Sequence, residues 1–145
     1  MSEALREAEN AAELGEVPVG CVIVRDGKVI ARAGNRRENG KCALDHAEII
    51  AIEKACRSLG GWRLPGCTLY VTLEPCPMCA GAIINSRIEN LYFGAYDKKS
   101  GCAGSVINLF ESGMFNHNVN VTGGITEDKC ASILTEFFRE LRKKK

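Results

Sequence analysis

The sequence predicts an α/β domain whose layers pack on a mixed β-sheet. Segments with a strand-like apolar pattern alternate along the chain with segments whose apolar residues recur at helical spacing. The 145 residues are 46% hydrophobic and 26% charged, which is typical of a globular protein with a sizeable core. No internal repeat, linker or low-complexity stretch occurs before the terminal lysines, so we expect a single domain over residues 1–145.

The first part of the chain is expected to form a helix followed by a β-hairpin. Residues 3–14 are predicted to be helical because apolar side chains recur there at helical spacing, at Leu5, Ala8 and Ala12. Residues 18–25 are rich in Val and Ile, and residues 28–33 are their predicted partner strand. Asp26-Gly27 lies between the two stretches, and such a pair favours the tight turn of a two-residue hairpin.

A polar loop with glycines, over residues 34–41, is expected to separate the hairpin from a second helix. That helix is predicted by an apolar stripe that stops before Gly60 and consists of Ala47, Ile50, Ala51, Ala55 and Leu59. A buried strand is expected over residues 68–73. The following helix, over residues 76–85, keeps its prolines in the first turn, where the N–H that proline lacks has no helical partner.

The last part of the chain is expected to add two short strands and a long helix. Residues 91–93 and 119–121 have the strand pattern, and residues 105–111 are expected to form a short helix between them. Thr126 is expected to cap the final helix, whose first turn is acidic. The apolar face of this helix, whose two phenylalanines are expected to lie in the core, consists of Cys130, Ala131, Leu134, Phe137, Phe138 and Leu141.

Charge, hydropathy and cysteine content exclude several classes of protein. The formal net charge is +1, which excludes binding of nucleic acid by bulk positive charge alone and leaves a local basic patch open. No apolar stretch reaches the ~18 residues of a membrane span, and the acidic, helical start is unlike a signal peptide. We therefore expect a cytoplasmic protein whose eight cysteines are buried thiols, metal ligands or catalytic groups.

Two short motifs stand where predicted helices begin. His46-Ala47-Glu48 stands at a predicted loop-to-helix junction, and Pro75-Cys76-Pro77-Met78-Cys79 stands at a predicted strand-to-helix junction. Together they read H-x-E…P-C-x-x-C, which is the signature of zinc-dependent deaminases. A catalytic zinc keeps three protein ligands and leaves its fourth position for water. We expect His46, Cys76 and Cys79 to be these ligands.

Glu48 follows the histidine closely enough along the chain to reach the same water. Zinc lowers the pKa of its water to about 7, so that hydroxide can attack an aromatic carbon that bears an amine. A carboxylate beside that water can take its proton, protonate a ring nitrogen and help ammonia to leave. The motif therefore predicts hydrolytic deamination without a nucleophilic side chain.

Each part of the pattern also has a simpler explanation. His46 alone could be an ordinary core or surface histidine, and Glu48 could cap the helix together with Asp45. The Cys-x-x-Cys pair could be a redox pair, or half of a four-ligand structural zinc site completed by His117 or another thiol. The two motifs together favour a catalytic site. The alternative outside the deaminases is a noncatalytic zinc module or a thiol-redox module.

Besides the zinc motif, a set of short segments spread over nearly the whole chain is informative: Glu16-Val17-Pro18-Val19-Gly20, Asn35, Thr72-Leu73-Glu74, Ala80-Gly81-Ala82, Ser86-Arg87-Ile88, Phe93 to Asp97, Gly101 to Ser105 and Phe137-Phe138-Arg139. With these segments the chain resembles the bacterial tRNA-specific adenosine deaminases, a branch of the cytidine deaminase-like superfamily. The zinc motif is specific to the superfamily, whereas the flanking segments point to the tRNA branch.

The resemblance implies a three-layer fold with a five-stranded mixed sheet between helices, and a homodimer with one zinc per subunit. It implies that adenosine becomes inosine at the wobble position of a tRNA anticodon, with Glu48 as proton shuttle. Deamination of a free base or nucleotide, such as guanine or cytidine, is the alternative. The implied contacts to the anticodon stem-loop are Asn35 and Ala47 at the base, Val17 in the pocket wall, Asp97 at the nucleotide backbone, and Phe138 and Arg139 at the loop surface.

Elementary chemistry gives partial support for an RNA substrate. A deaminase must draw its target base out of the stack, and single-stranded RNA loops allow this at low cost. Basic residues gather at the end of the last helix, where they either meet phosphates or form a solvated helix end: Arg139, Arg142, Lys143, Lys144 and Lys145.

Overall fold

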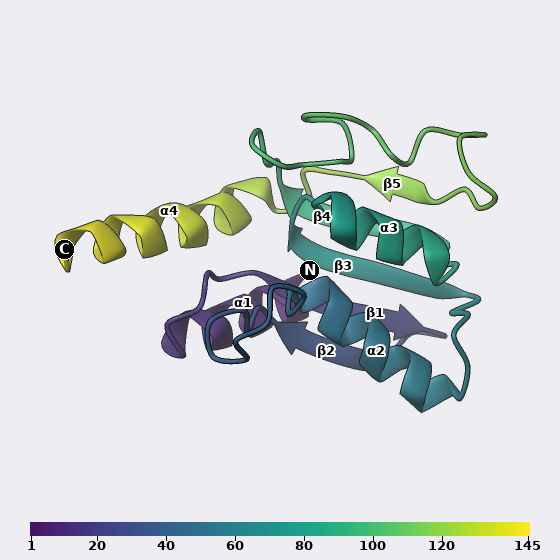
Figure 1. The fold of residues 1–145 in the computed structure, drawn as a ribbon, viewed down its shortest axis with the longest axis horizontal. Helices are drawn as coiled ribbons and strands as arrows, with labels where there is room; N and C mark the ends of the chain where they lie inside the picture. The colour runs from purple at the N-terminus through teal and green to yellow at the C-terminus, as the bar shows by residue number, and fades with distance from the viewer.

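The computed structural model, which describes all of residues 1–145, contains four helices and five strands (Figure 1). The α/β class expected from the sequence is confirmed. In chain order the elements are α1 (Ser2–Glu13), β1 (Gly20–Arg25), β2 (Lys28–Gly34), α2 (Ala47–Leu59), β3 (Cys67–Leu73), α3 (Pro77–Asn85), β4 (Asn90–Ala95), β5 (Asn120–Thr122) and α4 (Glu127–Lys143).

The five strands form one mixed sheet in the order β2-β1-β3-β4-β5. β1 pairs antiparallel with β2 and β3, whereas β3, β4 and β5 run parallel. The hairpin between β1 and β2 turns at Asp26 and Gly27, whose φ angles are 51° and 74°. Two residues with positive φ match the twist of the flanking strands, which explains the Asp-Gly pair. With this topology, the C-terminal ends of β2, β3 and β4 lie at the same edge of the sheet.

Helices cover both faces of the sheet (Figure 1). α2 and α3 pack beside each other on the face toward the viewer, and α1 and the start of α4 pack on the opposite face. The main core is a cluster of 21 buried residues that joins the sheet to α2 and α3, with Phe93, Ile23 and Leu69 among its largest members. This layer holds the two helix starts that carry the sequence motifs in fixed positions beside β3.

α1 packs closely on the sheet because the residues at the contact have small side chains. Ala4, Ala8 and Ala11 are the buried residues of this helix. A Cβ atom on Gly20 of β1 would collide with the helix backbone at Ala4 and Ala8. The glycine at the start of β1 is therefore required by the approach of the helix.

Cysteines outside the motif lie mostly in the interior, as expected. Cys21, Cys67, Cys102 and Cys130 are buried, and all eight cysteines are free thiols. None of the helices combines the length and apolarity needed to cross a bilayer.

The short helix expected over residues 105–111 is not formed. Turns and an isolated bridge between Ala103 and Asn108 occupy this stretch instead. The N–H of Ser105 donates to the carboxylate of Glu74, which lies far back in the chain. A tertiary contact therefore determines the local backbone, and the helical pattern in the sequence is overridden.

α4 begins where expected, but its cap and its packing differ from the expectation. Thr126 stands at the N-cap with φ of 47° and makes no side-chain capping bond. Cys130 is the only buried residue of the helix, and Phe138 is 40% exposed. The prediction that both phenylalanines lie in the core is wrong, since Phe137 is only half-buried. The reason is visible in Figure 1, where α4 projects away from the sheet after its first turns.

Candidate metal centre and its cleft

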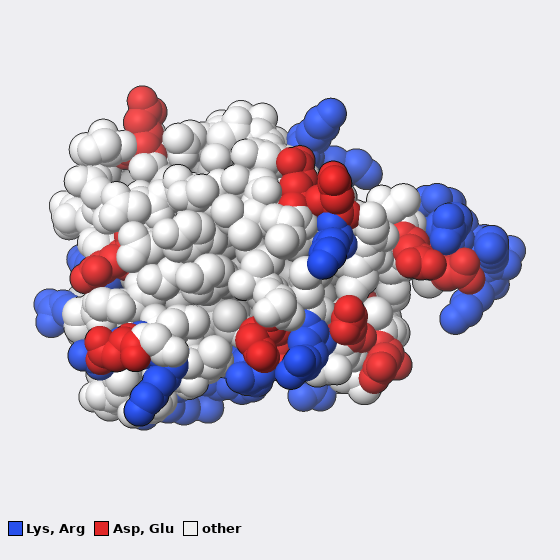
Figure 2. Space-filling model, turned by 180° about the vertical axis from the view of Figure 1, so that it is seen from behind, with Lys and Arg blue, Asp and Glu red and all other residues white.

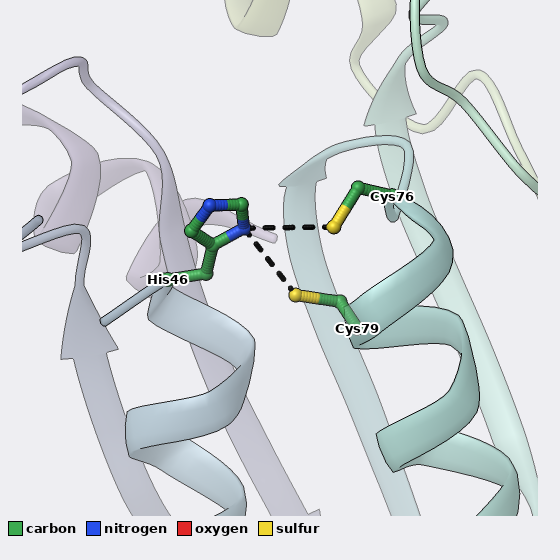
Figure 3. Close-up of side chains that lie close together, drawn as sticks. All are labelled: His46, Cys76 and Cys79. Atoms are coloured by element: carbon green, nitrogen blue, oxygen red, sulfur yellow. Dashed lines mark hydrogen bonds between the residues drawn. The ribbon is translucent and has the colours of Figure 1, made fainter. Parts of the chain in front are cut away.

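The starts of α2 and α3 bring together one imidazole and two thiols (Figure 3). His46 is the N-cap residue of α2, Cys76 is the N-cap residue of α3, and Cys79 lies in the first turn of α3. The Nδ1 atom of His46 lies 3.6 Å from the Sγ atom of Cys76 and 3.5 Å from that of Cys79. All three donor atoms lie within 4.8 Å of one another. We call this group the His/Cys/Cys cluster.

The local backbone leaves these side chains free to meet. Both N-cap residues are extended, with ψ of 151° at His46 and 175° at Cys76, and neither side chain caps its own helix. Pro77 occupies the first helical position, where its fixed φ suits the helix. The exposed N–H groups of two helix starts also favour negative charge at this point. The two junctions of the sequence motif thus form one site.

The cluster stabilises a thiolate. The pKa of Cys76 is lowered to about 4, chiefly by a hydrogen bond from the Cys79 thiol and also by one from His46. The hydrogen bond to Cys76 and burial raise the pKa of Cys79, and the bond to Cys76 raises that of His46. Two sulfurs and one imidazole nitrogen at these separations are a donor set that fits a metal ion.

Glu48 lies buried beside the cluster, in the first turn of α2. Desolvation raises the pKa of its carboxyl group to about 7, against the opposing effects of a backbone N–H and of His46. The alternative in which Asp45 and Glu48 form a capping box is wrong, because the N-cap residue of α2 is His46 and Glu48 lines a cleft instead. A carboxyl group with this pKa can both accept and release a proton near neutrality. The structural-zinc alternative also loses one of its ligands, because His117 is not among the donor groups that gather around Cys76 and Cys79.

A small cleft of about 130 Å³ opens above the cluster. Cys79 is buried and does not line the cleft. The residues singled out from the sequence that do line it are Val17, Asn35, His46, Ala47, Glu48, Cys76 and Asp97.

The amide of Asn35 is held in one orientation at the cleft wall. Its Nδ2 atom donates to the carbonyl of Val17 at 3.3 Å, and its Oδ1 atom accepts from the N–H of Arg37 at 3.2 Å. An amide has two N–H donors and two acceptor sites, so one of each remains for a ligand. The carboxylate of Asp97 already makes more hydrogen bonds within the protein, because one of its oxygens accepts from the N–H groups of both Lys99 and Ser100.

Phe138 and Arg139 do not lie in the cleft. Both are on the exposed part of α4, where Arg139 pairs with Glu136 at 3.4 Å and the ring of Phe138 meets Phe137 edge to face. Figure 2 shows Lys and Arg side chains gathered at the projecting end of this helix. The structure therefore separates the sequence-predicted residues into those around the cleft and those on α4.

Sequence reasoning missed several residues that line the cleft. Arg37 and Ser100 stand at its polar edge, Val19 and Leu73 add apolar surface, and Glu74 is part of the wall. Arg37 lies two residues after Asn35, and Glu74 directly precedes the cysteine motif. Proximity to these motifs was the available signal, but only the folded sheet edge brings the loops together.

Comparison with known proteins places this site among deaminases. The family model described as MafB19-like deaminase matches residues 1–142. The tRNA-specific adenosine deaminase of Bacillus subtilis (strain 168) is 54% identical over 145 residues, covering 100% of this chain and 90% of the relative. That of Agrobacterium fabrum is 50% identical over 142 residues, covering 98% of this chain and 93% of the relative.

Solved structures give the same picture. One comes from work on A-to-I editing by tRNA:A34 deaminases at the wobble position of transfer RNA; it matches with a TM-score of 0.89 and 49% identity over 92% of this chain and 97% of that one. A guanine deaminase from Nitrosomonas europaea matches with a TM-score of 0.82 and 26% identity, over 94% of this chain and 81% of that one. The three-layer deaminase fold with a five-stranded mixed sheet is confirmed.

Proposed function

We infer the chemistry of the cleft from the family to which this chain belongs, the tRNA-specific adenosine deaminases. The protein is a deaminase that converts adenosine to inosine at the wobble position of a tRNA anticodon, consuming water and releasing ammonia. The observation that carries this conclusion is the His/Cys/Cys cluster with the buried carboxyl group of Glu48 beside it, at the base of a cleft.

We propose that the metal of the His/Cys/Cys cluster is zinc, with one ion per subunit. A tetrahedral ion bonded to nitrogen at ~2.0 Å and to sulfur at ~2.3 Å separates those two atoms by ~3.5 Å. The Nδ1–Sγ distances of 3.6 and 3.5 Å support this geometry. When bound, zinc supplies the Lewis acidity that makes water a nucleophile near neutral pH.

Glu48 is the proposed proton shuttle. Its carboxylate takes the first proton of the attacking water and delivers it to a ring nitrogen of adenine; it then takes the second proton, from the hydroxyl group formed on the carbon, and gives it to the departing amine. Burial supports this role, because desolvation brings its pKa to about 7 and keeps bulk water from competing for the proton.

We also propose that three residues lining the cleft bind the target base. Asn35 offers one N–H and one acceptor to the edge of the base, and its fixed orientation supports selection of a base with matching groups. The backbone of Ala47 orients the base from the start of α2, and Val17 packs against its face. Together these residues hold the base after it has left the stack of the anticodon loop.

Contacts to the rest of the anticodon stem-loop are proposed for Asp97, Phe138 and Arg139. Asp97 lies at the edge of the cleft, where the nucleotide backbone would pass. Phe138 is exposed enough to stack on a base, which supports a role in RNA binding. Arg139 and the basic C-terminal end of α4 supply positive charge for phosphates.

We further propose that the protein is a cytoplasmic homodimer. Large apolar side chains are exposed in the connection between β4 and β5, namely Val106, Ile107, Met114 and Phe115, and burial against a second copy would remove them from water. Eight free thiols support a reducing compartment. Light scattering at micromolar concentration should give about twice the chain mass; a monomer would contradict the dimer.

An activity comparison tests the proposed function. The purified protein is incubated with an anticodon stem-loop carrying adenosine at the wobble position, and separately with free guanine and free cytidine. We expect inosine from the stem-loop and no ammonia from the free compounds. Ammonia from guanine or cytidine without inosine from the stem-loop would establish the free-base alternative instead.

A further inference from the structure

A second carboxylate, that of Glu74, is buried in the wall of the cleft and has no part in the chemistry above. Glu74 is 2% exposed and belongs to none of the ion pairs of the protein. A buried carboxylate is costly unless hydrogen bonds replace its water. The groups that donate to Glu74 therefore indicate what it does.

All the donors to the carboxylate come from one segment, residues 97–105, which we call the rim segment. The Oε1 atom of Glu74 accepts from the N–H of Asp97 at 3.0 Å. The Oε2 atom accepts from the N–H of Ala103 at 2.9 Å and from that of Ser105 at 3.1 Å. The hydroxyl of Ser105 also donates to Oε1. One carboxylate thus binds both ends of the rim segment.

The rim segment is folded tightly around this carboxylate. A Cβ atom on Gly101 would collide with the carboxylate of Glu74 and with the carbonyl of Asp97. A further bond, from the N–H of Cys102 to the carbonyl of Pro75 at 2.8 Å, ties the middle of the segment to the residue next to Glu74. The position of the rim segment is therefore defined relative to the turn that precedes α3.

The rim segment presents polar groups to the mouth of the cleft. Asp97 and Ser100 line the cleft, and Ser100 is exposed to solvent together with Lys98 and Lys99. The His/Cys/Cys cluster lies deeper, at the starts of the two helices. A polynucleotide whose base reaches the cluster brings its neighbouring nucleotides to the mouth of the cleft, which the rim segment borders.

We propose that Glu74 is a positioning residue for RNA, which fixes the rim segment so that Asp97 and Ser100 meet the nucleotides beside the target base. The inference rests on the proposed function, because it takes the ligand to be an RNA strand. Loss of such a role weakens binding equally before and during the reaction, so it raises KM and spares kcat. Loss of a role in holding Cys76 would instead lower metal content and kcat.

Glu74→Gln is the first test. Both carboxylate oxygens accept from backbone N–H groups, so the amide must turn its NH2 group toward a donor. We expect KM for the anticodon stem-loop to rise about tenfold, with kcat within about twofold and metal content unchanged. The matched control is Glu53→Gln, an exposed carboxylate on α2, which should leave both constants unchanged. A joint fall of kcat and metal content, or no change, would overturn the proposal.

Gly101→Ala provides an independent variant that leaves Glu74 itself intact. The added methyl group displaces the carboxylate, so this variant should show the same rise in KM with kcat preserved. Ser105→Ala removes the hydroxyl donor but keeps the N–H, so its rise in KM should be smaller. A normal KM in Gly101→Ala would contradict the positioning role.

Amide exchange followed by NMR tests, without any turnover, the premise that Glu74 fixes the rim segment. In the unmodified protein the amides of Asp97, Ala103 and Ser105 should exchange much more slowly than that of Lys98, which has no partner. In Glu74→Gln this protection should be lost at the amides that the new NH2 group faces, either that of Asp97 or those of Ala103 and Ser105. Equal exchange at all four amides of the unmodified protein would overturn the inference even if the variants fail to fold. Absence of inosine formation by the unmodified protein would instead contradict the proposed function alone.

Discussion

Glu48 carries the proposed proton transfer because its carboxyl group sits beside the His/Cys/Cys cluster and away from bulk water. The sequence motif placed it two residues after His46 but left open whether it caps the helix. The fold resolves that choice, since the first turn of α2 directs the side chain into the cleft.

Replacing Glu48 by Ala should leave the metal site intact and remove the proton shuttle. We expect one metal ion per chain, measured by mass spectrometry of the metal content, and a fall in deamination of about 10²- to 10⁴-fold. Glu48→Gln keeps the shape of the side chain and should show the same loss. Full turnover by either variant would contradict the assignment.

Asn35→Ala tests base recognition. Removing the amide leaves the bound base without its partner and should cost about 1–3 kcal/mol in kcat/KM for the stem-loop. Asn85→Ala, at an exposed position at the end of α3, is the matched control and should behave like the unmodified protein. Unchanged kinetics in Asn35→Ala would remove this residue from the proposed pocket.

At the scale of elements, local patterns predicted helices and strands well where short-range chemistry decides the backbone. The Asp26-Gly27 turn and the end of α2 at Gly60, which has φ of 75°, lie where the sequence placed them. The helix predicted over residues 105–111 is absent because the carboxylate of Glu74, about thirty positions earlier in the chain, binds the N–H of Ser105. Helical periodicity also predicted which residues of α4 share an apolar face, but it cannot predict whether another part of the protein covers that face.

The close packing of α1 on β1 gives a prediction at this scale. Gly20→Ala forces a methyl group into the backbone of α1 and should lower the free energy of unfolding by about 1–3 kcal/mol. Gly27→Ala has open space around it and should cost only the backbone strain of positive φ, about 1–2 kcal/mol. Urea denaturation measures both. Activity per folded molecule should stay constant in Gly27→Ala, whose turn is remote from the cleft lining.

At the scale of the whole molecule, the site is assembled from loops that the sheet brings to one edge. The grouping of the three proposed metal ligands with Glu48 could be predicted because these residues belong to two short motifs. Arg37, Ser100 and Glu74 could not, because their contribution depends on strand order, which places the C-terminal ends of β2, β3 and β4 at the same edge of the sheet. Local spacing therefore predicts the reacting groups, and topology determines the walls around them.

Metal removal is the corresponding test for the whole molecule. An ion that binds only the folded chain stabilises the folded state, by about 2.7 kcal/mol when the concentration of free ion is about a hundred times Kd. A chelator should therefore lower the Tm by roughly 5–10 °C and abolish deamination. Zinc should restore both and magnesium should not, because thiolates are poor ligands for magnesium. In Cys79→Ser the chelator should have little effect on the Tm; an equal shift would place the metal elsewhere.

The projection of α4 has a consequence for how this protein can diversify. Since Cys130 is its only buried residue, substitutions farther along the helix disturb little of the interior. The surface that would read an RNA can then vary between lineages while the reacting groups stay fixed. New recognition can in this way arise by mutation at one end of the chain without a compensating change in the hydrolytic centre.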